Sequence, residues 1–121
     1  MTLKNKKTTL AELLRTKDVY FRLYAQITDF DKVLQLENQV IEPIEKIVKA
    51  HDKKLEQFRE ELKKDETKKA DLDKAYNDML QAEVEYKLAV VSQEEVQKAG
   101  FNVFEYRIVK DIVETPKPIK K

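Results

Sequence analysis

A single run of regularly spaced residues constrains the fold of this chain more than any other feature of its sequence. From residue 34 to residue 62, side chains that can line one helix face recur at alternating steps of three and four. They are Leu34, Glu37, Ile41, Ile44, Val48, His51, Leu55, Phe58 and Leu62. This is the heptad pattern of a long helix that packs against a partner along its length. Pro43 lies within the run, and we expect a kink or a break there because proline lacks a backbone donor.

A second, shorter helix is predicted after a charged turn. The segment KKDETKKAD, residues 63–71, contains a single apolar side chain, and a helical apolar face follows it. That face consists of Leu72, Ala75, Tyr76, Met79 and Leu80. The two helices predict an antiparallel hairpin over residues 31–82. Because the returning helix is about half as long as the first, the first half of the long helix needs another cover.

The segments that flank the hairpin predict a helix before it and a strand after it. Thr9 and Glu12 have the spacing of a capping pair, and the apolar residues that follow predict a helix over residues 9–26. Alternating apolar and charged residues predict a strand near residues 83–90. A single strand cannot satisfy its own backbone groups. It must therefore pair with residues 2–4 or with another molecule.

Two short helices are predicted near the C-terminus. Ser92 and Glu95 repeat the capping relation, and Gly100 is placed to end the helix that they begin. Asn102 and Glu105 repeat the relation once more. A last helix is therefore expected to begin directly after the glycine.

This last predicted helix carries the densest cluster of large apolar residues. Phe104, Ile108 and Ile112 form one ridge at four-residue steps. The alternation of Phe104, Tyr106 and Ile108 is a rival signal for a strand, but the four-residue spacing favours a helix. We expect this helix to cover the first half of the long helix.

The composition indicates one mainly helical domain. The 121 residues include one glycine, whereas all-β folds use many in turns, and 39% of the residues are charged. The predicted fold class is mainly α: a helical hairpin with a long heptad-patterned helix, additional N- and C-terminal helices and a short β-strand. We expect a single domain over residues 1–121, with the strand and the C-terminal helices in residues 83–114. Residues 1–8 and 115–121 are expected to be flexible basic ends.

The sequence contains no recognisable catalytic, cofactor-binding or metal-binding motif. His51 is the only histidine and there is no cysteine, so a packed or hydrogen-bonded side chain is favoured over a metal ligand. A single glycine cannot build a phosphate-binding loop. No apolar run reaches the roughly 20 residues of a membrane span. We therefore expect a protein that is not an enzyme, needs no cofactor and does not enter a membrane.

Two apolar surfaces have no assured cover within the chain, namely the first half of the heptad run and the edge of the strand. The candidate partner contacts are Leu34, Ile41, Ile44 and Tyr86. Their partner is a second copy or a different protein, unless the first and last helices cover them within the monomer. Nucleic-acid binding by the basic ends is the weaker alternative, because the acidic remainder of the chain would repel phosphate.

The order of these elements resembles a family of short tailed-bacteriophage proteins of unknown function. The resemblance covers nearly the whole chain and is carried above all by the helix that runs into "EVEY" and by the "SQEEVQKAGFNVFEY" that follows. It implies a viral setting, in the host cytoplasm or in the virion, and brings no catalytic residues.

Taken with the lack of a chemical site, the resemblance favours a non-enzymatic phage protein that acts by protein–protein contact. Such a protein would be a virion or assembly component or an accessory factor. An inhibitor of a host defence or nuclease complex is the alternative, and a nucleic-acid-binding accessory protein is the third.

Overall fold

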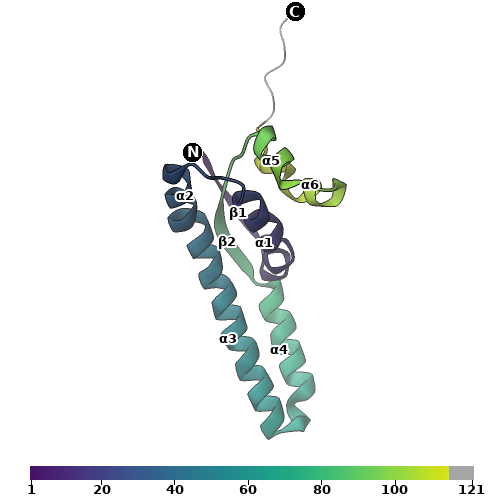
Figure 1. Cartoon of the computed structure of the whole chain (residues 1–121). Coiled ribbons are helices and arrows are strands. Elements are labelled where there is room, and N and C mark those ends of the chain that lie inside the picture. The colour runs from purple at the N-terminus through teal and green to yellow at the C-terminus, as the bar shows by residue number, and fades with distance from the viewer. Residues whose placement is uncertain (115–121) are drawn as a thin grey trace, which may run out of the picture.

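The two strands of the structure are far apart in the sequence and pair with each other. A computed structural model, which describes residues 1–114, contains an antiparallel sheet of β1 (Leu3–Thr9) and β2 (Glu83–Ala89), shown in Figure 1. Leu3 lies opposite Ala89 and Thr9 opposite Glu83. The strand near residue 83 is confirmed, and its partner is the same chain. The expectation that residues 1–8 are flexible is wrong for β1, whereas residues 115–121 lie outside the described residues.

The first helix begins where the sequence predicts. In α1 (Leu10–Tyr24), the backbone N–H of Glu12 donates to Thr9 Oγ1 over 3.2 Å, so the threonine satisfies one of the free amides at the helix start. The backbone N–H of Leu10 donates to the carbonyl of Ala82 over 2.9 Å. The same residues that end the sheet therefore begin the helix, which fixes α1 beside the strands.

The long helix is continuous but changes its winding once. It consists of α2 (Phe30–Leu36), a π-helical turn (Glu37–Ile41) and α3 (Glu42–Lys64). The predicted break at Pro43 does not occur. Instead, the N–H of Glu42 reaches back to the carbonyl of Glu37, and this wider turn makes room for a proline ring that would otherwise crowd a carbonyl of the preceding turn.

The π-helical turn moves the buried face of the long helix by one residue. Before and across the turn, Leu36, Val40 and Ile44 are buried at steps of four, whereas Leu34 and Glu37 are exposed. A wider turn adds about one residue to the repeat, so the heptad run cannot stay on one face through it. The predicted run is wrong before the turn. Beyond it, the predicted positions from 48 to 62 are buried or half-buried.

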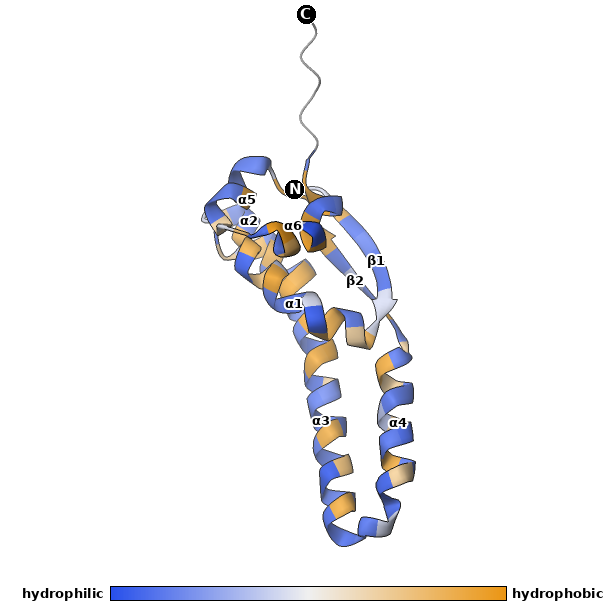
Figure 2. Cartoon of the chain, turned by 90° about the vertical axis from the view of Figure 1, so that its right-hand side faces the viewer, coloured by the Kyte–Doolittle hydropathy of each residue, from blue (hydrophilic) through white to orange (hydrophobic). Residues whose placement is uncertain are grey.

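The hairpin extends away from the sheet as an arm of two helices. A short 3₁₀ turn (Glu66–Lys68) joins α3 to α4 (Lys69–Gln81), and Figure 2 shows the two helices side by side beyond the sheet. Asp65 begins the turn by accepting a hydrogen bond from the N–H of Thr67 over 3.0 Å. The predicted helical hairpin is confirmed. No helix in the described part of the chain is long and apolar enough to cross a membrane.

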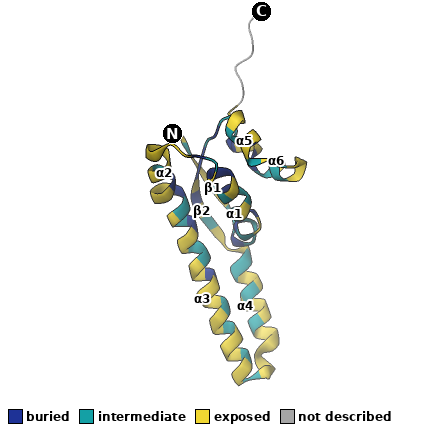
Figure 3. Cartoon of the chain, in the orientation of Figure 1, coloured by how far each residue is buried: buried dark blue, intermediate teal, exposed yellow. Residues whose placement is uncertain are grey.

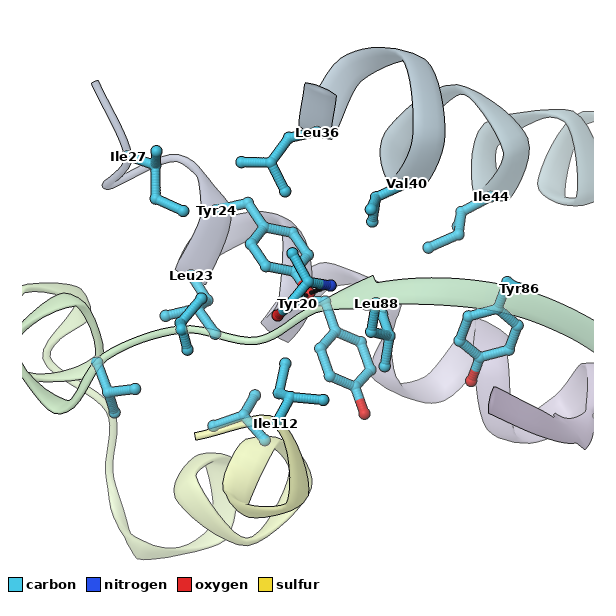
Figure 4. Packing of buried hydrophobic residues seen from close by; sticks show 14 of the residues in the cluster. Tyr20, Leu23, Tyr24, Ile27, Leu36, Val40, Ile44, Tyr86, Leu88 and Ile112 are labelled. Atoms are coloured by element: carbon cyan, nitrogen blue, oxygen red, sulfur yellow. Dashed lines mark hydrogen bonds between the residues drawn. The ribbon is translucent and has the colours of Figure 1, made fainter. Parts of the chain in front are cut away.

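The core lies where α1, β2 and the first half of the long helix meet, as Figure 4 shows. Its most deeply buried large side chains are Leu13, Tyr20, Leu23, Val40, Ile44, Leu88, Val91, Val109 and Ile112. These residues come from α1, the long helix, β2, the segment directly after β2 and the last elements of the described chain. The fold therefore closes a single core around α1.

The C-terminal elements lie on the opposite side of α1 from the long helix (Figures 1 and 4). They are α5 (Gln93–Ala99), α6 (Val103–Val109) and a 3₁₀ turn (Lys110–Ile112). The prediction that the last helix covers the long helix is wrong. Because β2 and α1 already cover Val40 and Ile44, the last helix packs on the remaining side of α1.

Two capping boxes and one glycine set the path between α5 and α6. Ser92 and Glu95 begin α5, Asn102 and Glu105 begin α6, and in each pair side chain and backbone bond reciprocally. Gly100 ends α5 in the left-handed conformation, with φ of 67°. All three predictions are confirmed.

Replacing Gly100 with alanine should lower the free energy of unfolding by about 1 kcal/mol. A Cβ at this position would meet no atom within 4 Å, so the cost arises from the backbone conformation alone. Urea denaturation measures the loss. Gly100→Asn is the control and should lose less, because asparagine tolerates the left-handed conformation. Equal losses for the two variants would contradict this explanation.

Candidate protein-interaction site

The four predicted partner contacts are not brought together. Ile44 has no exposed surface and Tyr86 is only 3% exposed, and both lie in the core. The prediction that these two side chains contact a partner is therefore wrong for this fold. Ile41 is half-buried against the core, and Leu34 is exposed on α2.

Tyr86 is buried because the strand edge that sequence reasoning left open is paired. Its hydroxyl lies 3.2 Å from Thr8 Oγ1, across the β1–β2 pair. One edge of β2 is therefore paired with β1, and the Tyr86 side chain is not available to a second molecule.

Apart from Met1, the exposed large apolar side chains of residues 1–114 form two groups. One is on α2 and contains Phe30, Val33 and Leu34; the other is on α6 and contains Val103, Phe104 and Tyr106. Figure 3 shows the exposed residues along the two helices. Phe30 and Phe104 are each 72% exposed. Aromatic side chains with that much surface in water are a feature of binding surfaces.

Val103 and Tyr106 of the α6 group border a hollow that we call the apolar groove. It is a cavity of about 500 Å³ between α5 and α6, and it is lined by Gln93, Val96, Gln97, Gly100, Phe101, Asn102, Val103, Tyr106 and Val113. Gly100, whose left-handed conformation ends α5, forms part of the lining between the two helices. Most of the lining is apolar, with amides at the rim.

The α6 group is held firmly against α1. Arg22 of α1 pairs with the carboxylate of Glu105 at 2.6 Å, and its guanidinium lies 4.6 Å from the centre of the Phe101 ring. Hydrogen bonding from Arg22, followed by that from the backbone of Asn102, lowers the pKa of the Glu105 carboxyl. Glu105 therefore stays charged at neutral pH and serves both as a helix cap and as an anchor.

A second hollow lies on the other side of α6, and we call it the cationic hollow. It is a cavity of about 500 Å³ between β1, α1 and α6, lined by Lys6, Glu12, Arg15, Tyr20, Phe104, Arg107, Ile108, Lys110 and Asp111. Four of these nine side chains are cations and two are carboxylates. The hollow therefore carries an excess of positive charge.

The floor of the cationic hollow is a hydrogen-bonded group. Lys6 Nζ donates to Tyr20 Oη over 3.1 Å and pairs with Asp111 at 3.3 Å, and the Tyr20 hydroxyl donates to the carbonyl of Ile108. Burial disfavours the charged form of Lys6, yet the bond to Tyr20 and the charge of Asp111 together raise its pKa. Burial raises the pKa of the Tyr20 hydroxyl, because it disfavours the charged form, and this outweighs the lowering of that pKa by Lys6. Neither group is poised to exchange a proton near neutral pH.

His51 is hydrogen-bonded within the arm formed by α3 and α4. It is 8% exposed, its Nε2 lies 2.8 Å from Tyr76 Oη and its Nδ1 lies 2.9 Å from Asp52 Oδ1. The prediction of a packed, hydrogen-bonded histidine is confirmed. Within residues 1–114, no three side chains of the metal-binding types gather into a possible site.

Sequence reasoning missed the α6 surface because it placed Phe104 on a buried ridge. The other members of that ridge do turn inward, Ile112 fully and Ile108 in part. The capping pair at Asn102 could have indicated the exposure of Phe104. It places Phe104 in the first turn of a short helix, where no preceding turn can cover the side chain. No family model, curated protein or solved structure matches the chain.

Proposed function

We propose that this chain acts without catalysis, through protein–protein contact, as a bacteriophage virion or assembly component or accessory factor. The observation that carries the proposal is the apolar surface of α6, where exposed Val103 and Tyr106 line the apolar groove and exposed Phe104 borders the hollow on the other side of the helix. The resemblance to tailed-phage proteins supports the viral setting.

The α6 surface has the composition and the rigidity of a binding surface. Two exposed aromatic side chains, Tyr106 at the apolar groove and Phe104 on the other side of the helix, can supply the buried anchors that dominate the affinity of many protein interfaces. The pairing of Arg22 with Glu105 holds the helix in place before a partner arrives. A surface that is already ordered loses less conformational entropy on binding.

The hydrogen-bonded titratable side chains also support a non-catalytic role. Lys6 bonds to both Tyr20 and Asp111, and His51 bonds to Tyr76 and Asp52. These groups hold elements together: the first set joins β1, α1 and the C-terminal turn, and the second joins α3 to α4. Side chains that connect elements in this way have a structural role.

Replacing Phe104 with alanine should weaken binding to a protein partner by about 2 kcal/mol, or roughly thirtyfold in Kd, because a well-packed aromatic anchor is lost. The partner surrogate is a set of peptides selected from a random display library on the immobilised full chain. Fluorescence anisotropy with the selected peptides gives the two dissociation constants. The stability of the variant should stay within about 0.5 kcal/mol of the parent.

Phe30→Ala is the matched control, because Phe30 is the same residue type with the same exposed fraction. It should leave peptide binding unchanged. Peptides that lose affinity with Phe30→Ala but not with Phe104→Ala would move the site to α2. Failure to enrich any peptide that depends on either side chain would contradict the proposal, unless light scattering shows that copies of the chain bind each other through α6.

A further inference from the structure

The helix α6 separates two hollows of different chemistry. The apolar groove lies on one side of it and the cationic hollow on the other. Val103 and Tyr106 line the first hollow, and Phe104 and Arg107 line the second. The guanidinium of Arg107 lies 5.8 Å from the centre of the Phe104 ring, so a cation and a highly exposed aromatic side chain lie next to each other.

Two cations of the cationic hollow are left without an acidic partner. Glu12 pairs with Arg15 at 2.6 Å, and Asp111 pairs with Lys6 at 3.3 Å. Within residues 1–114, no carboxylate forms an ion pair with Arg107 or with Lys110, and both side chains belong to exposed residues. Both carboxylates of the hollow are used by other cations, so its excess positive charge lies at these two residues.

We propose that the partner of the α6 surface docks with an acidic amphipathic segment of a protein. Apolar side chains of that segment fill the apolar groove beside Tyr106, and its carboxylates meet Arg107 and Lys110 in the cationic hollow. The inference rests on the proposed function and adds the chemistry of the partner to it. Complementary charge guides encounter and selects among partners, whereas the apolar contact supplies most of the affinity.

The arrangement fits a protein segment better than it fits a nucleic acid. A phosphate backbone carries continuous negative charge and is bound by many cations along its path. Here the two unpaired cations stand among carboxylates, with Glu105, Asp111 and Glu12 all close to α6. An amphipathic segment brings carboxylates at chosen positions together with apolar side chains, and the groove requires the apolar side chains.

The test uses the full chain and a random peptide display library, followed by anisotropy with the selected peptides. Peptides that need Phe104 should be enriched in Asp and Glu as well as in apolar residues. The double variant Arg107→Glu, Lys110→Glu should bind them about tenfold more weakly, because two attractions become repulsions. The affinity of the parent should fall as salt is raised, and that of the double variant should not.

The matched control is Lys53→Glu, Lys54→Glu, which makes the same charge change at exposed residues of α3 in the arm. It should leave the affinity within twofold of the parent, as roughly expected for a distant surface change. Circular dichroism of both double variants checks that they stay folded.

The outcomes separate the inference from the function on which it rests. Peptides that need Phe104 but carry no acidic bias, and that bind the Arg107→Glu, Lys110→Glu variant as well as the parent, overturn the inference alone. Absence of any peptide that needs Phe104 removes the proposed use of this surface and the inference with it. Labelled DNA or RNA that binds at low salt, loses affinity in the same variant and displaces the acidic peptides would overturn the inference in favour of a nucleic-acid ligand.

Discussion

Replacing Tyr24 with phenylalanine should lower the free energy of unfolding by about 3 kcal/mol, although it removes a single oxygen atom. The Tyr24 hydroxyl accepts a hydrogen bond from the N–H of Ala89 over 2.8 Å and donates one to the carbonyl of the same residue over 3.0 Å. Both residues are buried, with 4% and 0% of their surface exposed. Phenylalanine would leave a donor and an acceptor without partners in a place that water does not reach.

The register of the sheet explains why Ala89 depends on this side chain. The N–H of Val90 donates to the carbonyl of Thr2, so the backbone groups of Val90 face β1. Hydrogen-bonding direction alternates along an antiparallel strand. The groups of Ala89 therefore face away from β1, toward a side where the two-stranded sheet of the described chain has no further strand. The Tyr24 hydroxyl takes the place of that strand.

The protonation state of Tyr24 supports this role. Burial raises the pKa of its hydroxyl far above the ordinary value, so the group remains a donor at any pH used for unfolding experiments. Urea denaturation at neutral pH measures the loss. Tyr106→Phe is the control: its hydroxyl belongs to a residue that is 44% exposed, and its removal should change stability by less than about 0.5 kcal/mol. Equal stability of the two variants would show that water reaches Ala89.

The parts of the fold that were predictable from sequence depend on near neighbours in the chain. Thr9, Ser92 and Asn102 each begin a helix by bonding to an amide three residues away, and Gly100 ends one through its own backbone angles. Alternation along residues 83–90 depends only on the pleat of a strand. Spacing within a few residues is visible in a sequence, so these elements could be predicted.

The parts that were not predictable depend on distant partners. Residues 3–9 contain three lysines and little apolar alternation, and they form a strand because their backbone pairs with β2, which lies far away in the chain. Lys6 also bonds to Tyr20 and Asp111, which come from other elements. Likewise, the last helix packs on α1 because β2 already covers the first half of the long helix. The α6 surface was missed for the same reason, since its exposure follows from where the core closes.

The predicted and observed buried faces of the long helix differ before the π-helical turn, and this difference can be tested directly. Two spacing patterns in this part of the sequence make different predictions. The heptad run places Leu34 inward, whereas steps of four from Ile44 through Val40 place Leu36 inward. Leu36 is 3% exposed and Leu34 is 45% exposed, so the structure follows the second pattern. The π-helical turn from Glu37 to Ile41 makes the second pattern compatible with the heptad run that follows.

Leu36→Ala should therefore cost about 3 kcal/mol of unfolding free energy, and Leu34→Ala less than about 0.5 kcal/mol. The two substitutions are chemically identical and lie in the same helix, and alanine forms helix as well as leucine does. The difference between them reports burial and nothing else. Urea denaturation of both variants beside the parent measures that difference. A regular α-helix through Pro43 would place Leu34 and Leu36 about 80° to either side of Ile44, at roughly 100° per residue. The two substitutions would then have comparable costs, and that result would remove the π-helical turn from the fold.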